Sequence, residues 1–133
     1  MNKPNEEKKP FEREDIHKIL SSYEALGCSV ITEFNYSRQG FFEAKRWEVV
    51  PSSLYNKNKK YYDLQSLCGF GSFNKSLTYV KFRFELNSTH LDYFVGDARD
   101  PDADIQDPHK ELSNIISSLG LENKDIREYK LSE

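Results

Sequence analysis

The sequence predicts an α+β fold: an antiparallel sheet of five or six strands, packed with an N-terminal and a C-terminal helix. Apolar residues recur at helical spacing near both ends of the chain and alternate along the runs between them. Short connections join these runs, which favours antiparallel pairing, and an aromatic content of 14% favours a sheet. We expect a two-layer sandwich with both helices on one face. A cystatin-like arrangement, in which the sheet curls around the first helix, is one option.

The first helix is expected over residues 11–26. Its apolar side chains fall at helical spacing and are Ile16, Ile19, Leu20, Tyr23 and Leu26. Acidic residues near its first turn favour the helix dipole, and Gly27 directly follows the last apolar position as a natural stop. Residues 1–10 are charged and carry two prolines, so they are expected to form a flexible tail before a single domain over 11–133.

The next two runs predict a hairpin. Residues 28–38 and 41–51 alternate in polarity and are separated by a short connection that contains Gly40. The following residues, 52–60, are polar and are expected to form a loop. Residues 61–73 carry apolar side chains interrupted by two glycines, which predicts a strand with a bulge or turn.

The clearest strand covers residues 77–88. One face of it carries Val80, Phe82, Phe84 and Leu86, and the other, expected to be exposed, carries Tyr79, Lys81, Arg83 and Glu85. Residues 90–98 are expected to pair back onto this strand. The second helix is then expected to begin with Asp107 as N-cap and to end at Gly120, and residues 125–131 predict an edge strand or a helical turn.

Charge and composition restrict the class of protein. The net charge is −3, with eleven basic and nine acidic side chains in residues 1–60 against eight and thirteen in residues 61–133. An acidic second half argues against nucleic-acid binding, which needs a basic face. The sequence shows no apolar stretch of a signal peptide or of a membrane span, and two cysteines are too few for a disulfide framework. We therefore expect a cytoplasmic chain with reduced thiols and no membrane partner.

Five aspartates crowd the segment before the second helix: Asp97, Asp100, Asp102, Asp104 and Asp107. Counting from Asp100, they match the alternating frame of a calcium-binding loop, with Glu111 as its distal ligand. However, Ile105 occupies the position that needs glycine, and a strand rather than a helix precedes the segment. No metal and no other cofactor is predicted. The aspartates are then either turn and cap residues or a surface that steers a basic partner.

A second cluster combines basic and aromatic residues: Lys57, Lys59, Lys60, Tyr61 and Tyr62. Such residues can hold phosphates and stack bases, so a small nucleic-acid-binding module or ribonuclease is the alternative function. No linear motif of a nucleophile, a metal site or a phosphate-binding loop accompanies the cysteines, histidines and glycines of the chain. The sequence therefore does not predict an enzyme.

The function predicted from these observations is that of a protein-binding inhibitor without catalysis, of the antitoxin or immunity kind. It would occlude the active site of a toxin or other enzyme that has a basic cleft. The predicted contacts are four acidic residues with three residues of an exposed sheet face, namely Asp97, Asp100, Asp102, Asp104, Trp47, Tyr79 and Arg83. A small-ligand binder, with its pocket between sheet and helix, is a further alternative.

Overall fold

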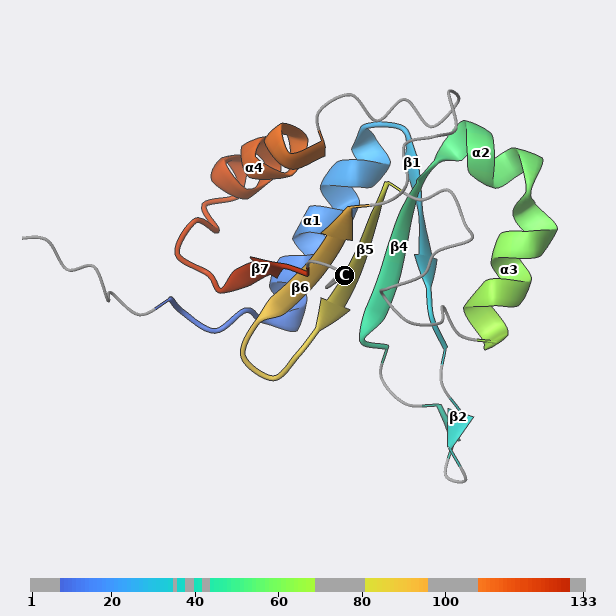
Figure 1. Cartoon of the computed structure of the whole chain (residues 1–133), viewed down its shortest axis with the longest axis horizontal. Coiled ribbons are helices and arrows are strands. Elements are labelled where there is room, and N and C mark those ends of the chain that lie inside the picture. The colour runs from blue at the N-terminus through green and yellow to red at the C-terminus, as the bar shows by residue number, and fades with distance from the viewer. Residues whose placement is uncertain are drawn as a thin grey trace, which may run out of the picture.

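The computed structural model describes residues 8–34, 36–37, 40–41, 44–68, 81–95 and 108–129 (Figure 1). The helices in these ranges are α1 (Arg13–Ala25), α2 (Ser52–Lys57), α3 (Lys59–Cys68) and α4 (Pro108–Ser118). The strands are β1 (Cys28–Thr32), β2 (Tyr36–Ser37), β3 (Gly40–Phe41), β4 (Arg46–Pro51), β5 (Phe82–Leu86), β6 (Leu91–Val95) and β7 (Ile126–Glu128). The α+β class is confirmed, although the described part of the chain has four helices where two were predicted.

Five strands form one sheet in the order β1-β4-β5-β6-β7, and β2 pairs with β3 separately. The β1–β4, β4–β5 and β5–β6 pairs are antiparallel, as predicted, whereas β7 runs parallel to β6. The register places Trp47 opposite Phe84 and Val49 opposite Phe82. These four side chains therefore share one face of the sheet.

Helices α1 and α4 cover that face (Figure 1). Four apolar residues of α1 are buried there, and Leu112 and Ile115 of α4 join the same cluster. Phe82 and Phe84 stack with their ring centroids 5.6 Å apart, and Tyr23 lies 5.5 Å from Phe82. The predicted apolar stripes of both terminal helices are thus confirmed as part of the core, except for Leu26, which lies beyond the end of α1 and is 57% exposed.

Both of these helices end at a glycine that the sequence predicted. Gly27 and Gly120 have φ angles of 88° and 70°, which a residue with a Cβ adopts only with strain. After α4, the amide of Gly120 donates to Ser117 and the amide of Leu121 donates to Ile116, the pattern of a Schellman motif. This motif satisfies the last carbonyls of α4 and returns the chain toward β7.

Residues 52–68 correct the prediction of a polar loop and a strand, because they form α2 and α3. Leu54 of α2 and Tyr62 of α3 are both buried against Ile31 and Val50. These two strand residues point away from α1, so at β1 and β4 the sheet carries helices on both faces. The two-layer and cystatin-like arrangements are therefore not confirmed.

The N-terminal segment lies beside the C-terminal one at the β7 edge. The amide of Lys9 donates to the carbonyl of Asn123 at 2.8 Å, and Lys9 bridges Lys124 in parallel. The ammonium of Lys124 lies 3.2 Å from the buried carboxylate of Asp15. This pairing brings residues far apart in sequence together, while the division into tail and domain stays a prediction. Among the helices of the described ranges, none is long and apolar enough to cross a membrane.

Candidate functional site

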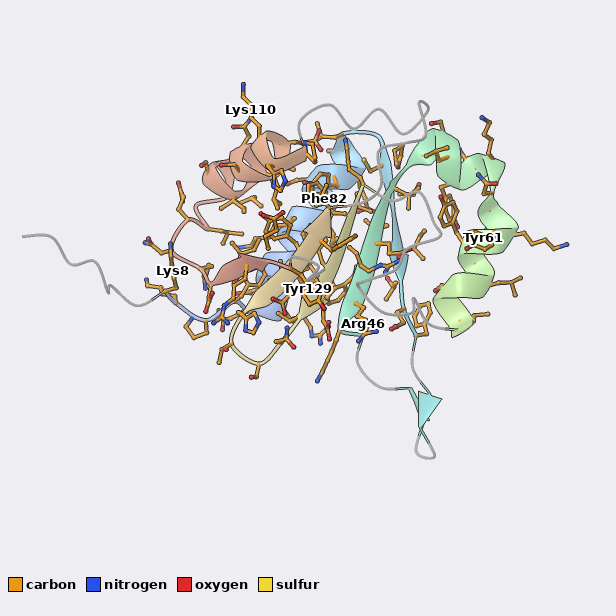
Figure 2. The ribbon with its side chains drawn as sticks, in the orientation of Figure 1. Lys8, Arg46, Tyr61, Phe82, Lys110 and Tyr129 are labelled. Atoms are coloured by element: carbon orange, nitrogen blue, oxygen red, sulfur yellow. The ribbon has the colours of Figure 1, made fainter. Side chains whose placement is uncertain are left out.

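The outer side of α3 exposes a row of large apolar side chains. Tyr61, Leu64 and Leu67 are 48%, 57% and 54% exposed, and they follow one another at intervals of three residues along the helix. Phe34, which is 43% exposed, lies beside the end of α3, where its amide donates to the carbonyl of Ser66. We call these four residues the α3 stripe. Figure 2 places Tyr61 on the side of the molecule opposite Lys8.

The inner side of α3 anchors the helix to the sheet. Tyr62 is buried, and its ring stacks on that of Tyr55 with centroids 5.9 Å apart. The buried Ser66 hydroxyl donates to the carbonyl of Thr32, and the Ser66 carbonyl accepts from Phe34. Ser66 thus occupies backbone groups on the free edge of β1 that would otherwise be open to another strand. The α3 stripe is consequently displayed by a helix that is fixed on its other side.

Replacing Ser66 by alanine is expected to lower the free energy of unfolding by about 1–3 kcal/mol, because the Thr32 carbonyl loses a buried donor. Urea unfolding followed by circular dichroism measures this loss. Ser22→Ala is the matched control, since the exposed Ser22 hydroxyl donates to Lys18 within α1. The control should change stability by less than about 0.5 kcal/mol. Equal effects of the two substitutions would contradict the anchoring role.

Basic residues lie at the start of α3. Residues 52–68 contain one acidic residue, Asp63, and three basic ones, Lys57, Lys59 and Lys60. The net charge of this segment is therefore +2. The Lys59 ammonium lies 2.7 Å from the Asp63 carboxylate, which also accepts from Tyr55 at 2.8 Å. The hydrogen bond from Lys59 lowers the pKa of Asp63, and the same bond raises the pKa of Lys59. The charge of Asp63 is therefore already satisfied by Lys59 of α3 and Tyr55 of α2.

The residues of the predicted nucleic-acid cluster are thus brought together on α2 and α3, but not as one surface. Tyr61 is exposed, whereas Tyr62 is 1% exposed and cannot stack on a base. Lys59 lies over the Tyr55 ring, 5.6 Å from its centroid. Of the predicted partner contacts, Asp97, Asp100, Asp102, Asp104 and Tyr79 lie outside the described residues.

Trp47 was predicted on an exposed face, and this is wrong, because Trp47 is 2% exposed. Its pairing with Phe84 puts the indole on the face that α1 covers. There the Arg13 guanidinium lies 5.7 Å from the ring centroid and the His17 ring lies 6.0 Å away. Trp47 therefore belongs to the core, and we do not retain it as a contact residue.

Arg83 was also predicted to be exposed, and it is 1% exposed. Strand alternation does place the Arg83 side chain on the other face of β5 from Phe82 and Phe84. On that face its partner across the β4–β5 pair is Glu48. The Nε and Nη2 atoms of Arg83 both contact Oε2 of Glu48, with Nε at 2.6 Å. The opposite charge explains how both side chains can be buried. Burial raises the pKa of Glu48 more than Arg83 lowers it.

A second, more open charge cluster lies on the same side of the sheet. Arg46 is 3.6 Å from the carboxylate of Glu33 and 3.5 Å from that of Glu85.

Elsewhere, burial raises the pKa of the Cys28 thiol, which makes it a poor nucleophile. Within the described ranges, no group of three or more His, Cys, Asp or Glu residues is arranged to hold a metal ion.

Comparison of the chain with protein-family models, curated proteins and solved structures finds no match. A signal for the α3 stripe was nevertheless present in the sequence. Leu54, Asn58, Tyr62 and Ser66 recur every four residues, and on this helical period Tyr61, Leu64 and Leu67 fall on the outer side. The three lysines within residues 52–60 led to the prediction of a loop instead.

Proposed function

We propose that the protein is a non-catalytic protein-binding module that holds its partner through the α3 stripe. One observation carries this proposal. Six large apolar side chains are exposed among the described residues, and four of them lie on or beside α3. Clustered apolar residues of this kind characterise surfaces that another protein covers, whereas single exposed ones are ordinary.

The chemistry of the stripe fits a protein partner. Tyr61 offers a flat apolar ring with a polar tip. Tyrosine is enriched among the residues that contribute most to the binding energy of protein interfaces. Leu64 and Leu67 contribute apolar area that gains free energy when it is removed from water. The anchoring of Tyr62 and Ser66 to the sheet means that little conformational entropy is lost on binding.

The specific form we propose is an inhibitor of the antitoxin or immunity kind. A helix fixed to a sheet and rich in apolar area can occlude an active site without chemistry of its own. The acidic residues Asp97, Asp100, Asp102 and Asp104 remain a predicted second contact, which would steer a basic partner toward the complex. Exchanging these residues for asparagine should then lower the association rate and its dependence on salt.

Leu64→Asp is expected to weaken the complex about 30-fold or more, because a charge at the centre of the α3 stripe must be desolvated on binding. The partner is first captured from an extract of the organism that encodes the chain and identified by mass spectrometry. The purified partner is then titrated against both proteins by calorimetry. If the partner is an enzyme, its activity should fall as the complex forms and recover with Leu64→Asp.

Leu26→Asp is the matched control, because Leu26 is also 57% exposed but lies at the end of α1, outside the stripe. It should bind like the wild-type chain. A complex that tolerates Leu64→Asp and Leu26→Asp equally well would sink the assignment of the site. Salt-dependent RNA binding that is lost with alanine at Lys57, Lys59 and Lys60 would instead support the nucleic-acid alternative.

A further inference from the structure

The two ends of the α3 stripe differ in charge, and this difference describes the partner. At the start of α3 lie Lys59 and Lys60, and Lys57 is the last residue of α2. Lys59 pairs with Asp63 at 2.7 Å, so Lys57 and Lys60 account for the net charge of +2 in residues 52–68. Acidic groups of a partner are therefore favoured over the first turn of α3.

The other end of the stripe is apolar. Leu67 is 54% exposed there, and Phe34 lies beside the last turn of the helix. The nearby cation, Arg46, is within 3.6 Å of two carboxylates, those of Glu33 and Glu85. The surface thus changes from basic to apolar along about 9 Å, the rise of six helical residues.

The free edge of β1 distinguishes two ways in which a partner could dock, namely by adding a strand to the sheet or by packing side chains against α3. A partner strand would need the backbone groups of Thr32 and Phe34, and Ser66 already bonds to both. Strand addition is closed at this place, so the partner must pack side chains against α3. A helix with apolar residues at i, i+3 or i+4, and i+7 spans about 10 Å, which matches the length of the stripe.

A second copy that pairs through its own α3 does not fit the charges. Residues 52–68 hold one acidic residue, Asp63, and Lys59 and Tyr55 occupy it. Parallel pairing of two α3 helices would place lysines opposite lysines. Antiparallel pairing would place them opposite Leu67. Neither arrangement provides the missing negative charge.

We infer that the occupant of the α3 stripe is an amphipathic helix of another protein, with acidic residues at the end that lies over Lys60 and the start of α3. This inference rests on the proposed function and adds the chemistry and the orientation of the partner segment. The contact is of the helix-on-helix kind, in which apolar anchors give affinity and the charged end sets direction.

Displayed random peptides of about 16 residues, long enough for four helical turns, provide the test. They are selected on the wild-type chain after counter-selection on Leu64→Asp. The enriched peptides should combine helical apolar spacing with Asp or Glu at one end. The affinity of a synthesised member should fall about tenfold with Lys60→Glu and should decline with salt, whereas Lys18→Glu, an exposed change on α1, leaves it unaltered.

Exchanging the acidic residues of that peptide for lysine should restore its binding to Lys60→Glu. The inference is overturned if the enriched peptides are neutral or basic, or if Lys60→Glu binds them as the wild type does. It is also overturned if only phosphatidylserine vesicles bind, or if the stripe closes a dimer that Leu64→Asp dissolves in sedimentation. A native partner that needs Leu64 but presents no acidic helix overturns this inference alone. Binding of the native partner that Leu64→Asp does not weaken overturns the proposed site as well.

Discussion

Replacing Arg83 by methionine is expected to lower the free energy of unfolding by about 3–5 kcal/mol at pH 7. The substitution keeps the side-chain volume but leaves the carboxylate of Glu48 buried and unpaired. Glu48 is fully buried, and its Oε1 atom has no hydrogen-bond partner among the described residues of the wild-type protein. The remaining carboxylate oxygen depends on Arg83 alone among the contacts of the described residues. Urea unfolding at pH 7 measures the loss.

The loss should depend on pH, with a sign that follows from the raised pKa of Glu48. Burial raises this pKa above its ordinary value of 4.5, so between the two values the folded state binds more protons than the unfolded state. The contribution of Glu48 is therefore most favourable below the unfolded pKa and is lost as pH rises through the folded one. Removing Arg83 raises the folded pKa further, so the deficit of Arg83→Met should shrink as the pH falls from 7 toward 5.

The double variant Glu48→Gln/Arg83→Met separates charge from packing. It should recover much of the stability at pH 7, because no buried charge remains, and it should lose the pH dependence of the single variant. A deficit of Arg83→Met that stays constant between pH 7 and pH 5 would show that an unpaired Glu48 charge is not its cause.

Trp47→Ala is expected to cost about 3–5 kcal/mol, because the substitution opens a cavity between α1 and the sheet. The Arg13 guanidinium would also lose the ring beside it. Trp47 is the sole tryptophan of the chain, so its fluorescence reports the state of this core directly. In the wild-type protein its emission should shift to longer wavelength on unfolding in urea but should not shift when a partner binds.

Tyr61→Ala should differ from Trp47→Ala in its effects on stability and on partner binding. Since Tyr61 is half exposed, its replacement should change stability by less than about 0.5 kcal/mol while it weakens partner binding. The pair of variants therefore distinguishes a core aromatic residue from a surface one. A Trp47→Ala variant as stable as the wild type would refute the packing described for the indole.

Elements with one clear apolar period could be predicted from the sequence. The stripe of α1, the apolar face of β5 and the helix expected after Asp107 all lead to the structure observed. In both helices the buried face is mainly apolar and the opposite face is polar, so one period dominates. In β5 the apolar face is buried as expected, but the polar face also carries a buried residue, Arg83. The two terminal glycines were predictable for a different reason, because their φ angles are those that glycine adopts without strain.

The candidate site could not be predicted in the same way. In residues 52–68 the buried positions of α2 and α3 include Ser66, and the exposed ones include leucines, so the two faces look alike in polarity. Alternation along β4 shows which side chains share a face with Trp47, but it does not show which face a helix covers. The parallel pairing of β7 depends on contacts with β6 that lie more than thirty residues away.

The β7 edge also fixes how the protein can be tethered. The described chain enters at Lys8 and leaves at Tyr129, both beside β7, while α3 packs at the opposite edge along β1. Five strands at about 4.8 Å spacing separate the two places by roughly 19 Å. A label, a fusion partner or a solid support attached at Lys8 or at Tyr129 would therefore leave α3 on the far side of the sheet. Such attachment offers a direct way to measure what the helix binds.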